Sequence, residues 1–587
     1  MTFTGRHPRT LSALIMPLTR VRKVIPQARN EGCVGNSRTP RCVATLGATD
    51  PTDGGGSMQP TQAHRLISGQ AREEALAPTG SPFDEIAGTF DYIIVGGGGT
   101  AAAFIDATIE QRPEVRVLVL EQGDSMIPTH AQNLGVSYQP LMASMGASPW
   151  ASEGDLSLAP QVPHLGGRTL VWSGSCPQPT RDQLRSWPRD IVDDLDAHWH
   201  DARSWLGVRP AVDTGPEYAA LHAAIRRASA RATVRQRTLV TPACDKDLDA
   251  PLAYLPHVGG GGQKFAAIVP LVRAAAVHNG VQIVTGCMVH SLSVANGEVV
   301  AIRTNHGNVD VRGSRVILAA GSAEATSIVL RSRPELSAPL AGARLSASAA
   351  SFSTCRIPRS AFRGLSHDRA ELAALYINGT AGPRDFHLHL TAAATSTPAR
   401  DLQRVFHLLP DMFGDGTPER MCDPEHVVLL VHGLCQIGQN ESGQDMNRIW
   451  IDTRRRTISS IQLDDFDRHV WDQMDEAIDA VVSSVAGGGQ VEYWNALEDQ
   501  WQRHPPSRRM PTAFHETGTL CMGTDAASSV TDTWGQVRGA TNLFILGGAT
   551  FPFHGSWNPF LTMVALARRL ARELERRGHH GRNEAQQ

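Results

Sequence analysis

Four consecutive glycines and the two residues after them have the types and spacing to hold a pyrophosphate. Gly96, Gly98 and Ala101 occupy the three key places of the pattern G-x-G-x-x-G/A, with Gly99 and Thr100 between them. The first place allows a tight turn, the second lets backbone approach the pyrophosphate, and the third permits close helix–strand packing. The spacing therefore predicts binding of an adenine dinucleotide, the usual carrier of redox chemistry.

Such a loop works only between a strand and a helix. Residues 92–95 predict a buried strand of a parallel sheet, and residues 102–110 predict a helix whose N-terminus favours phosphate. A second strand is expected at 115–120. It ends in Glu121, 23 residues beyond Gly98, where an acidic residue takes the ribose hydroxyls. This strand–loop–helix–strand unit predicts binding of an adenine dinucleotide but does not distinguish NAD from FAD.

A histidine and an asparagine near the C-terminal end could act on a hydroxyl group. His515 stands in FHETGTLCMGTD and Asn558 in FPFHGSWNPFLTMVALA. A histidine accepts a proton near neutral pH because its ordinary pKa is about 6.5. Taken alone, Asn558-Pro559 predicts only a helix start. That helix should bury its apolar side chains and turn Arg568 and Arg569 towards water.

Composition bounds the class of protein. The chain has 587 residues with 41% hydrophobic and 19% charged residues, typical of soluble globular domains. A net charge of -3 argues against a nucleic-acid partner, and the longest apolar runs are too short for a membrane span. Nine cysteines without C-x-x-C spacing favour reduced thiols in a cytoplasmic protein and predict no metal site. The composition of residues 1–85 predicts a mostly disordered extension, and Met58 within it is a possible translation start.

Three segments resemble the glucose-methanol-choline (GMC) oxidoreductases, a flavoprotein family. They are PHLGGRTLVWSGSCPQP at 163–179, SRVILAAGSAEATSIVLRS at 314–332, and FHETGTLCMGTD with NLFILGGATFPFHGSWNPFLTMVALA at 514–567. The last looks closest to the pyranose-oxidase-like branch. The resemblance covers residues 90–335 and 440–575 and implies that His515 and Asn558 are the catalytic pair.

The resemblance also implies which residues would contact FAD. Some relatives bind FAD covalently through a histidine, but Val171 stands at that place, so non-covalent FAD is expected. His554 and Trp557 are candidates for the substrate pocket, although a polar loop histidine and a core aromatic explain them as well. The expected FAD contacts are Gly96, Gly98, Gly99, Thr100, Ala101, Glu121, Gly167, Arg168, Thr169, Val171, Trp172, Ser173, Val289, Ala320, Gly321, Gly548, Ala549, Pro559 and Phe560.

The expected fold class is α/β, or α+β when the whole chain is considered. A Rossmann-like FAD-binding domain is expected to be interleaved with a substrate domain built on an antiparallel sheet. Strands at 384–396, 425–439 and 447–463 show alternation suited to one covered face. The expected FAD-binding parts are 86–195, 255–340 and 501–575. The expected substrate parts are 196–254 and 341–500, and 576–587 is expected to be a tail.

The expected reaction is oxidation of a CH–OH group of a carbohydrate-like alcohol by hydride transfer to FAD, with His515 as the base. The electron acceptor would be oxygen, a quinone or another acceptor. Residues 401–500 contain nineteen Asp and Glu against seven Arg, which is either a solvated face or a site for a cationic amino sugar. Aryl or aliphatic alcohols are a further alternative. An NAD-dependent dehydrogenase and a GMC-fold lyase are the rival classes.

Overall fold

The computed structural model describes residues 81–240, 248–256, 262–332, 336, 338–410, 417–438 and 447–584. Residues 63–587 form one compact unit. Most of the expected disordered extension, up to residue 80, lies outside the described residues. Its last part was predicted wrongly, because Phe83–Glu85 form a 3-10 helix and the Ser81 N–H donates to the Ile283 carbonyl at 2.8 Å.

A five-stranded parallel sheet carries the glycine-rich loop. Its order is β21-β11-β1-β2-β7, and every neighbouring pair is parallel. All of β1, the central strand, is buried, as a sheet covered on both faces requires. The first predicted strand is confirmed and the second begins two residues later than expected. The bounds are β1 Tyr92–Val95, β2 Val117–Leu120, β7 Val281–Val284, β11 Arg315–Leu318 and β21 Leu543–Ile545.

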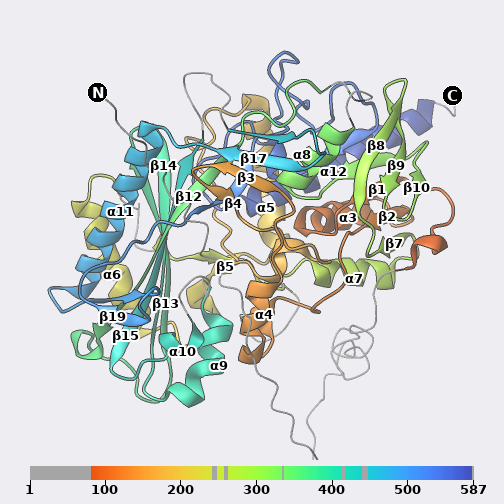
Figure 1. Cartoon of the computed structure of the whole chain (residues 1–587). Helices are drawn as coiled ribbons and strands as arrows, with labels where there is room; N and C mark the ends of the chain where they lie inside the picture. The colour runs from red at the N-terminus through yellow and green to blue at the C-terminus, as the bar shows by residue number, and fades with distance from the viewer. Residues whose placement is uncertain are drawn as a thin grey trace, which may run out of the picture. The chain divides into compact units, whose positions relative to one another are not determined.

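Helices pack on this sheet and on one another (Figure 1). They are α3 Gly99–Gln111, α5 Arg189–Trp205, α7 Ile268–Val277, α8 Ser322–Arg331 and α12 Phe560–Glu584. Helix α5 packs against α12, so this half extends to Trp205, beyond the boundary expected at 195. Helix α12 likewise continues through most of the expected tail.

The expectation that the two α12 arginines face water was wrong. Arg568 is only 1% exposed and forms ion pairs with Asp106 and Glu110 of α3 and with Asp201 of α5, at 2.6–2.8 Å. Arg569, 5% exposed, pairs with Asp194. Helices α3 and α5 cover the polar side of α12, so the arginines serve as electrostatic links between helices.

A large antiparallel sheet forms the second half. Its main order is β13-β14-β15-β12-β18-β19, and β20 pairs with both β12 and the short β4. The bounds are β4 Ser157–Leu158, β12 Ser346–Pro358, β13 Glu371–Ala381, β14 Arg384–Ala394, β15 His426–Ile437, β18 Glu492–Asn495, β19 Gln500–Gln502 and β20 Thr512–Thr517. Strand β20, expected within the FAD-binding part, therefore belongs to this sheet.

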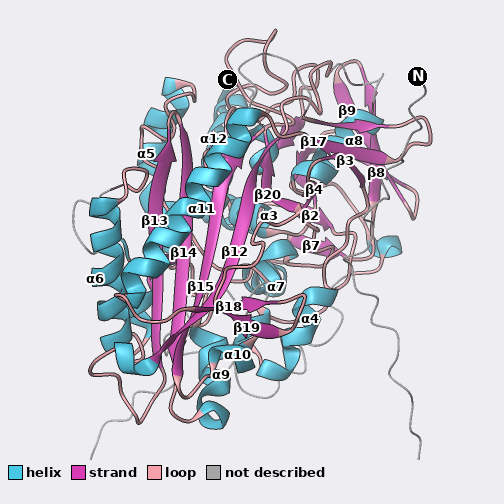
Figure 2. Cartoon of the chain, turned by 60° about the vertical axis from the view of Figure 1, so that its left-hand side comes forward, coloured by secondary structure: helices cyan, strands magenta, loops and turns pink. Residues whose placement is uncertain are grey.

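Helices cover one face of that sheet. Helix α11 Asp465–Ala486 and helix α6 Ala220–Arg235 pack on β13 and β14 (Figure 2). The prediction of one covered face was wrong, because every residue of β14 is buried. The alternating polar residues of β14, including His387 and His389, therefore lie against protein on the other face, which the alternation by itself does not reveal.

Smaller elements join the two halves. Strand β3 pairs in parallel with β17 across more than 300 residues of sequence. The remaining bounds are β3 Ala151–Gly154, β5 Arg209–Pro210, β6 Pro251–Leu252, β8 Val289–Ala295, β9 Glu298–Thr304, β10 Asn308–Asp310, β16 Arg448–Ile451, β17 Thr457–Ile461, α4 Gln139–Ser144, α9 Pro398–Leu408 and α10 Pro418–Met421.

Two properties concern the described residues alone. None of their helices is long and apolar enough to cross a membrane. The six cysteines among them are free and buried, consistent with the expectation of reduced thiols.

Candidate active site

A cavity of about 630 Å³ lies between the two sheets. One side is formed by the carboxyl ends of the parallel strands and the loops that follow them. The other side is formed by β12, β14, β15 and the segment through His515. Ligands of open parallel sheets bind at the carboxyl ends of the strands, so this is the place where a dinucleotide is expected.

The glycine-rich loop shapes one wall of the cavity. Gly96 has a φ of 95°, and a side chain there would lie 2.8 Å from the Ala319 carbonyl oxygen. An added Cβ at Gly98 would meet no protein atom within 4 Å, although Gly98 lines the cavity. Helix α3 begins directly afterwards, and the first N–H groups of a helix have no partner within it. This empty cradle beside a helix N-terminus fits a pyrophosphate.

Glu121 also lines the cavity as predicted. Its buried carboxylate accepts the N–H groups of Gly97 at 2.7 Å and Gly123 at 3.0 Å. Burial raises the pKa of Glu121, whereas these backbone N–H groups lower it. The two bonds hold the side chain still and leave further lone pairs for a ribose hydroxyl.

The second glycine-rich segment braces the cavity. Arg168, expected to contact the cofactor, pairs with Glu516 at 2.7 Å and donates to the carbonyls of Ala159 and Pro160. Thr169 accepts the Ala267 N–H at 2.8 Å through its hydroxyl. The Arg168–Glu516 pair therefore ties this segment to the residue next to His515.

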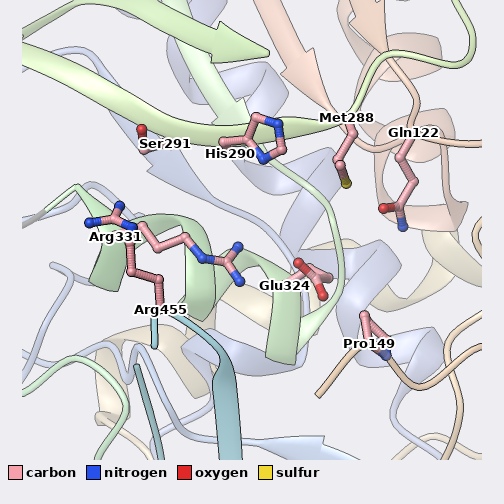
Figure 3. Close-up of a pocket in the computed structure, with 8 residues that line it drawn as sticks. All are labelled: Gln122, Pro149, Met288, His290, Ser291, Glu324, Arg331 and Arg455. Carbon is pink, nitrogen blue, oxygen red and sulfur yellow. The ribbon is translucent and has the colours of Figure 1, made fainter. Parts of the chain in front are cut away.

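A smaller pocket of about 460 Å³ opens beside the nucleotide end of the cavity (Figure 3). It shares Gln122 and Glu324 with the cavity. Burial raises the pKa of Glu324, while the nearby positive charge of Arg331 lowers it. The shared residues make this pocket a side opening of the same site.

His515 reaches the cavity from β20 with unusual backbone geometry. Its φ is 58°, a left-handed conformation that is uncommon for residues other than glycine and occurs frequently at functional sites. Burial lowers the pKa of His515 well below its usual value, and His554, His389 and Arg168 lower it further. The imidazole is therefore neutral at neutral pH and able to accept a proton. Its Nδ1 has no hydrogen-bond partner among the described residues.

Asn558 lies at the cavity wall just before α12, and Pro559 and Phe560 line the same wall. A side chain at Gly99 would overlap the Phe560 ring, so the N-termini of α3 and α12 approach each other here. Each N-terminus carries roughly half a positive elementary charge. The two helices therefore create a positive field at the cavity.

Four residues on the antiparallel-sheet side were not predicted from the sequence. They are Phe352, His389, His432 and Phe514, all of which line the cavity. The His389 Nε2 lies 3.0 Å from the Asn558 Oδ1. The alternation of histidines in RDFHLHL was visible in the sequence, but nothing local indicated that this strand face meets Asn558.

Aromatic rings extend across the antiparallel sheet in one row. Phe352 of β12 is paired in register with His432 of β15, His432 with His389 of β14, and His389 with Tyr376 of β13. The rings of Phe352 and His432 stack at 4.2 Å, and Phe514 lies 5.9 Å from Phe352. Phe352, His432 and His389 of this row, together with Phe514, give the cavity an aromatic floor on the antiparallel-sheet side.

Most of the predicted site residues line the cavity, but four do not. Ala101 and Ala549 are buried behind it, as small residues that permit close packing. His554 and Trp557, the substrate-pocket candidates, are at most 1% exposed and absent from the wall. Their rings lie 5.5 Å apart, and His554 is 5.9 Å from the His515 ring. The structure therefore places them behind the catalytic candidates.

The other predicted residues of the loops and strands lie along the wall. They are Gly96, Gly98, Gly99, Thr100, Glu121, Gly167, Arg168, Thr169, Val171, Trp172, Ser173, Val289, Ala320, Gly321, Gly548, Pro559 and Phe560. Together they form a continuous path from Glu121 to His515 and Asn558.

Comparisons with known proteins agree with this arrangement. Residues 90–346 and 451–567 match the two family models described as GMC oxidoreductase. A solved structure, pyridoxine 4-oxidase from Mesorbium loti, aligns with a TM-score of 0.54 over 83% of this chain and 99% of its own, at 16% identity. At that identity the likeness concerns the fold alone.

Two curated relatives match over short segments. The 6'''-hydroxyparomomycin C oxidase of Streptomyces lividus is 43% identical over 60 residues, 10% of this chain and 11% of the relative. Paromamine 6'-oxidase of Streptomyces fradiae is 38% identical over 71 residues, 12% of this chain and 13% of the relative. The chain thus matches only about a tenth of the length of each.

Proposed function

Because the chain belongs to the GMC oxidoreductase family, we propose that it is an FAD-dependent enzyme that oxidises a CH–OH group to a carbonyl. One observation carries this proposal. His515 and Asn558, from the C-terminal part of the chain, line the same cavity as the glycine-rich loop and Glu121, which come from the N-terminal part of the described residues. A dinucleotide fold without that pair would support cofactor binding alone.

The residues around the cavity fit FAD held without a covalent bond. Gly98 and the N-terminus of α3 would hold the pyrophosphate, and Glu121 the ribose. The segment from Gly167 to Ser173 and the start of α12 would hold the isoalloxazine. When bound, FAD supplies the acceptor for a hydride. Val171 offers no atom for a covalent link, in contrast to a histidine at that place.

The protein's own residues perform the acid–base part of the reaction. His515 takes the proton of the substrate hydroxyl: the O–H bond breaks and an N–H bond forms on the imidazole. Its lowered pKa keeps the ring free of a proton at neutral pH. Asn558 hydrogen-bonds the same oxygen and stabilises the charge that develops there. The positive field of the α12 N-terminus would favour negative charge on a cofactor held beside it.

We propose a carbohydrate-like alcohol as the substrate. The ring row gives an aromatic floor for the apolar face of a sugar ring, and the two curated relatives are named as oxidases of 6'''-hydroxyparomomycin C and of paromamine. A cationic amino sugar is less well supported, because none of the Asp and Glu residues that the structure describes within 401–500 lines the cavity. Glu516, the carboxylate next to His515, already pairs with Arg168.

An aryl alcohol is the second candidate. Phe352, His432 and Phe514 can stack on a planar ring, and the nearby Leu434 and Met510 add apolar surface. An aromatic ring would use this floor without the several hydrogen bonds that a sugar requires.

Purified protein tests the proposal. It should be yellow, and anaerobic mixing with the correct alcohol should bleach the visible flavin bands. The panel contains D-glucose, a polyol, paromamine and benzyl alcohol. Subsequent peroxide formation in air identifies oxygen as the acceptor, and reoxidation by a quinone alone identifies a dehydrogenase. Colourless protein that gains no colour with FAD would refute the proposal, and yellow protein that no alcohol bleaches would favour a lyase.

A further inference from the structure

Asn558 is held by a side chain from the other half of the protein. The His389 Nε2 lies 3.0 Å from the Asn558 Oδ1, and both residues are less than 9% exposed. On its other side, the His389 Nδ1 lies 3.5 Å from the Ser175 hydroxyl. The three residues form a buried chain at the cavity wall.

The chemistry of this chain sets the direction of each bond. A carbonyl oxygen only accepts, so the His389 Nε2 must carry the proton that it donates to Asn558. In the neutral tautomer the Nδ1 is then an acceptor, which suits the Ser175 O–H. With its oxygen occupied by His389, the Asn558 carboxamide can offer its NH₂ group to another oxygen.

We propose that His389 is a positioning residue that holds the Asn558 carboxamide with its NH₂ group turned towards the substrate oxygen. The inference rests on the proposed function and adds the residue that orients one member of the pair. Asn558 then acts only as a donor, and His515 is left as the base. A carboxamide turned the other way would present its oxygen to the developing alkoxide and repel it.

The surroundings favour this role over a structural one. His389 occupies the centre of the ring row, between Tyr376 and His432, where its backbone register is set by two neighbouring strands. A rigid strand fixes a side chain more precisely than a loop does. Asn558, by contrast, lies in a segment before a helix start. The hydrogen bond from His389, which is fixed on a strand, therefore restrains the Asn558 side chain.

A double-mutant cycle tests the proposal in the full-length holoenzyme. The variants are His389→Leu, Asn558→Ala and both together, with benzyl alcohol or D-glucose as the probe, whichever bleaches the wild type faster. Stopped flow gives the limiting rate of flavin reduction and the substrate Kd separately. Asn558→Ala should slow reduction ~10²-fold or more. His389→Leu should slow it ~10-fold to 10²-fold with Kd changed less than about threefold.

The diagnostic result is the double variant. It should reduce flavin no more slowly than Asn558→Ala alone, because His389 acts through Asn558. His389→Gln should restore part of the rate, since its amide can donate where the imidazole did. Multiplicative losses in the cycle, or no rescue by Gln, would overturn the inference.

A matched control comes from the neighbouring strand. His432 is directly opposite His389 and lines the same cavity, but its ring stacks on Phe352. His432→Leu should mainly raise Kd, and its effect should multiply with that of Asn558→Ala. Wild-type protein that no alcohol bleaches would refute the proposed function and this inference together. If an alcohol bleaches the wild type but the rate losses of His389→Leu and Asn558→Ala multiply in the double variant, the inference alone is refuted.

Discussion

The two halves of the site are built on opposite principles. The parallel-sheet half lines the cavity mainly with backbone: glycines, helix N-termini and one carboxylate held by N–H groups. The antiparallel-sheet half presents side chains in a row set by strand register. A backbone cradle suits a cofactor that never changes, whereas a row of side chains can vary without disturbing the strands. We therefore expect changes in the first half to remove the cofactor. Changes in the second half should alter the reduction rate at His515 and His389, and substrate binding at the other rings of the row.

The largest expected effect is from filling the cradle. Gly98 has a φ of -96°, which any residue adopts, so Gly98→Val adds volume without backbone strain. The valine would occupy the space next to α3, and the protein should fold but contain no FAD. Visible absorbance and circular dichroism measure the two properties. Gly135→Val, at a φ of -72° outside the cavity wall, should stay yellow.

Replacing His515, the proposed base, should lower the rate and leave the colour of the protein intact. His515→Ala should slow flavin reduction at least ~10²-fold, as loss of a general base does. The variant should still bind FAD, because His515 lies on the antiparallel side of the cavity. His554→Gln, whose ring lies behind the wall, should cost less than about tenfold. Near-wild-type reduction by His515→Ala in stopped flow would exclude His515 as the base.

The end of the ring row formed by Phe352 and His432 should control affinity. Phe352→Ala removes the ring that stacks on His432 and should raise the substrate Kd about tenfold, the equivalent of a lost aromatic contact. The limiting reduction rate should change less than about threefold. A large fall in that rate with unchanged Kd would contradict the assignment of Phe352 to substrate binding.

The halves also differ in how they are held together. Arg568 links α12 to α3 and α5 through carboxylates that are 27–45% exposed. Arg568→Met should lower the free energy of unfolding by about 2–3 kcal/mol, less than for a fully buried network because solvent screens those carboxylates. Urea unfolding measures this. The exposed pair Arg456–Asp452 offers the control, since Arg456→Ala should cost less than about 1 kcal/mol.

Acid should destabilise the protein through buried histidines. Burial lowers the pKa of His554 to about 3 and that of His387 and His515 well below the ordinary value. The unfolded chain therefore binds protons below about pH 6.5 that the folded chain does not. Stability is retained above that pH and declines below it. These three groups contribute about 2 kcal/mol of that loss between pH 7 and 6, and His130, whose pKa burial also lowers to about 3, adds to it. Urea unfolding at each pH measures the slope, and His554→Gln should reduce it.

The nucleotide half was readable because its signals are local. Strand, glycines, helix, strand and Glu121 follow one another within about thirty residues, as the motif requires. The family resemblance added His515 and Asn558, both of which line the cavity. The antiparallel half has no comparable local motif. Its strands were recognised by alternation, but alternation does not say what covers the second face.

The dinucleotide-type loop and, through the resemblance, the candidate catalytic pair could be predicted from the amino-acid sequence, because neighbouring residues or short motifs carry those signals. The contact between His389 and Asn558, the row of four rings across β13, β14, β15 and β12, and the burial of Arg568 became visible in the fold alone. These features join residues that lie far apart along the chain. His389 and Asn558 are 169 residues apart, and no local pattern encodes which strand face will meet which helix start.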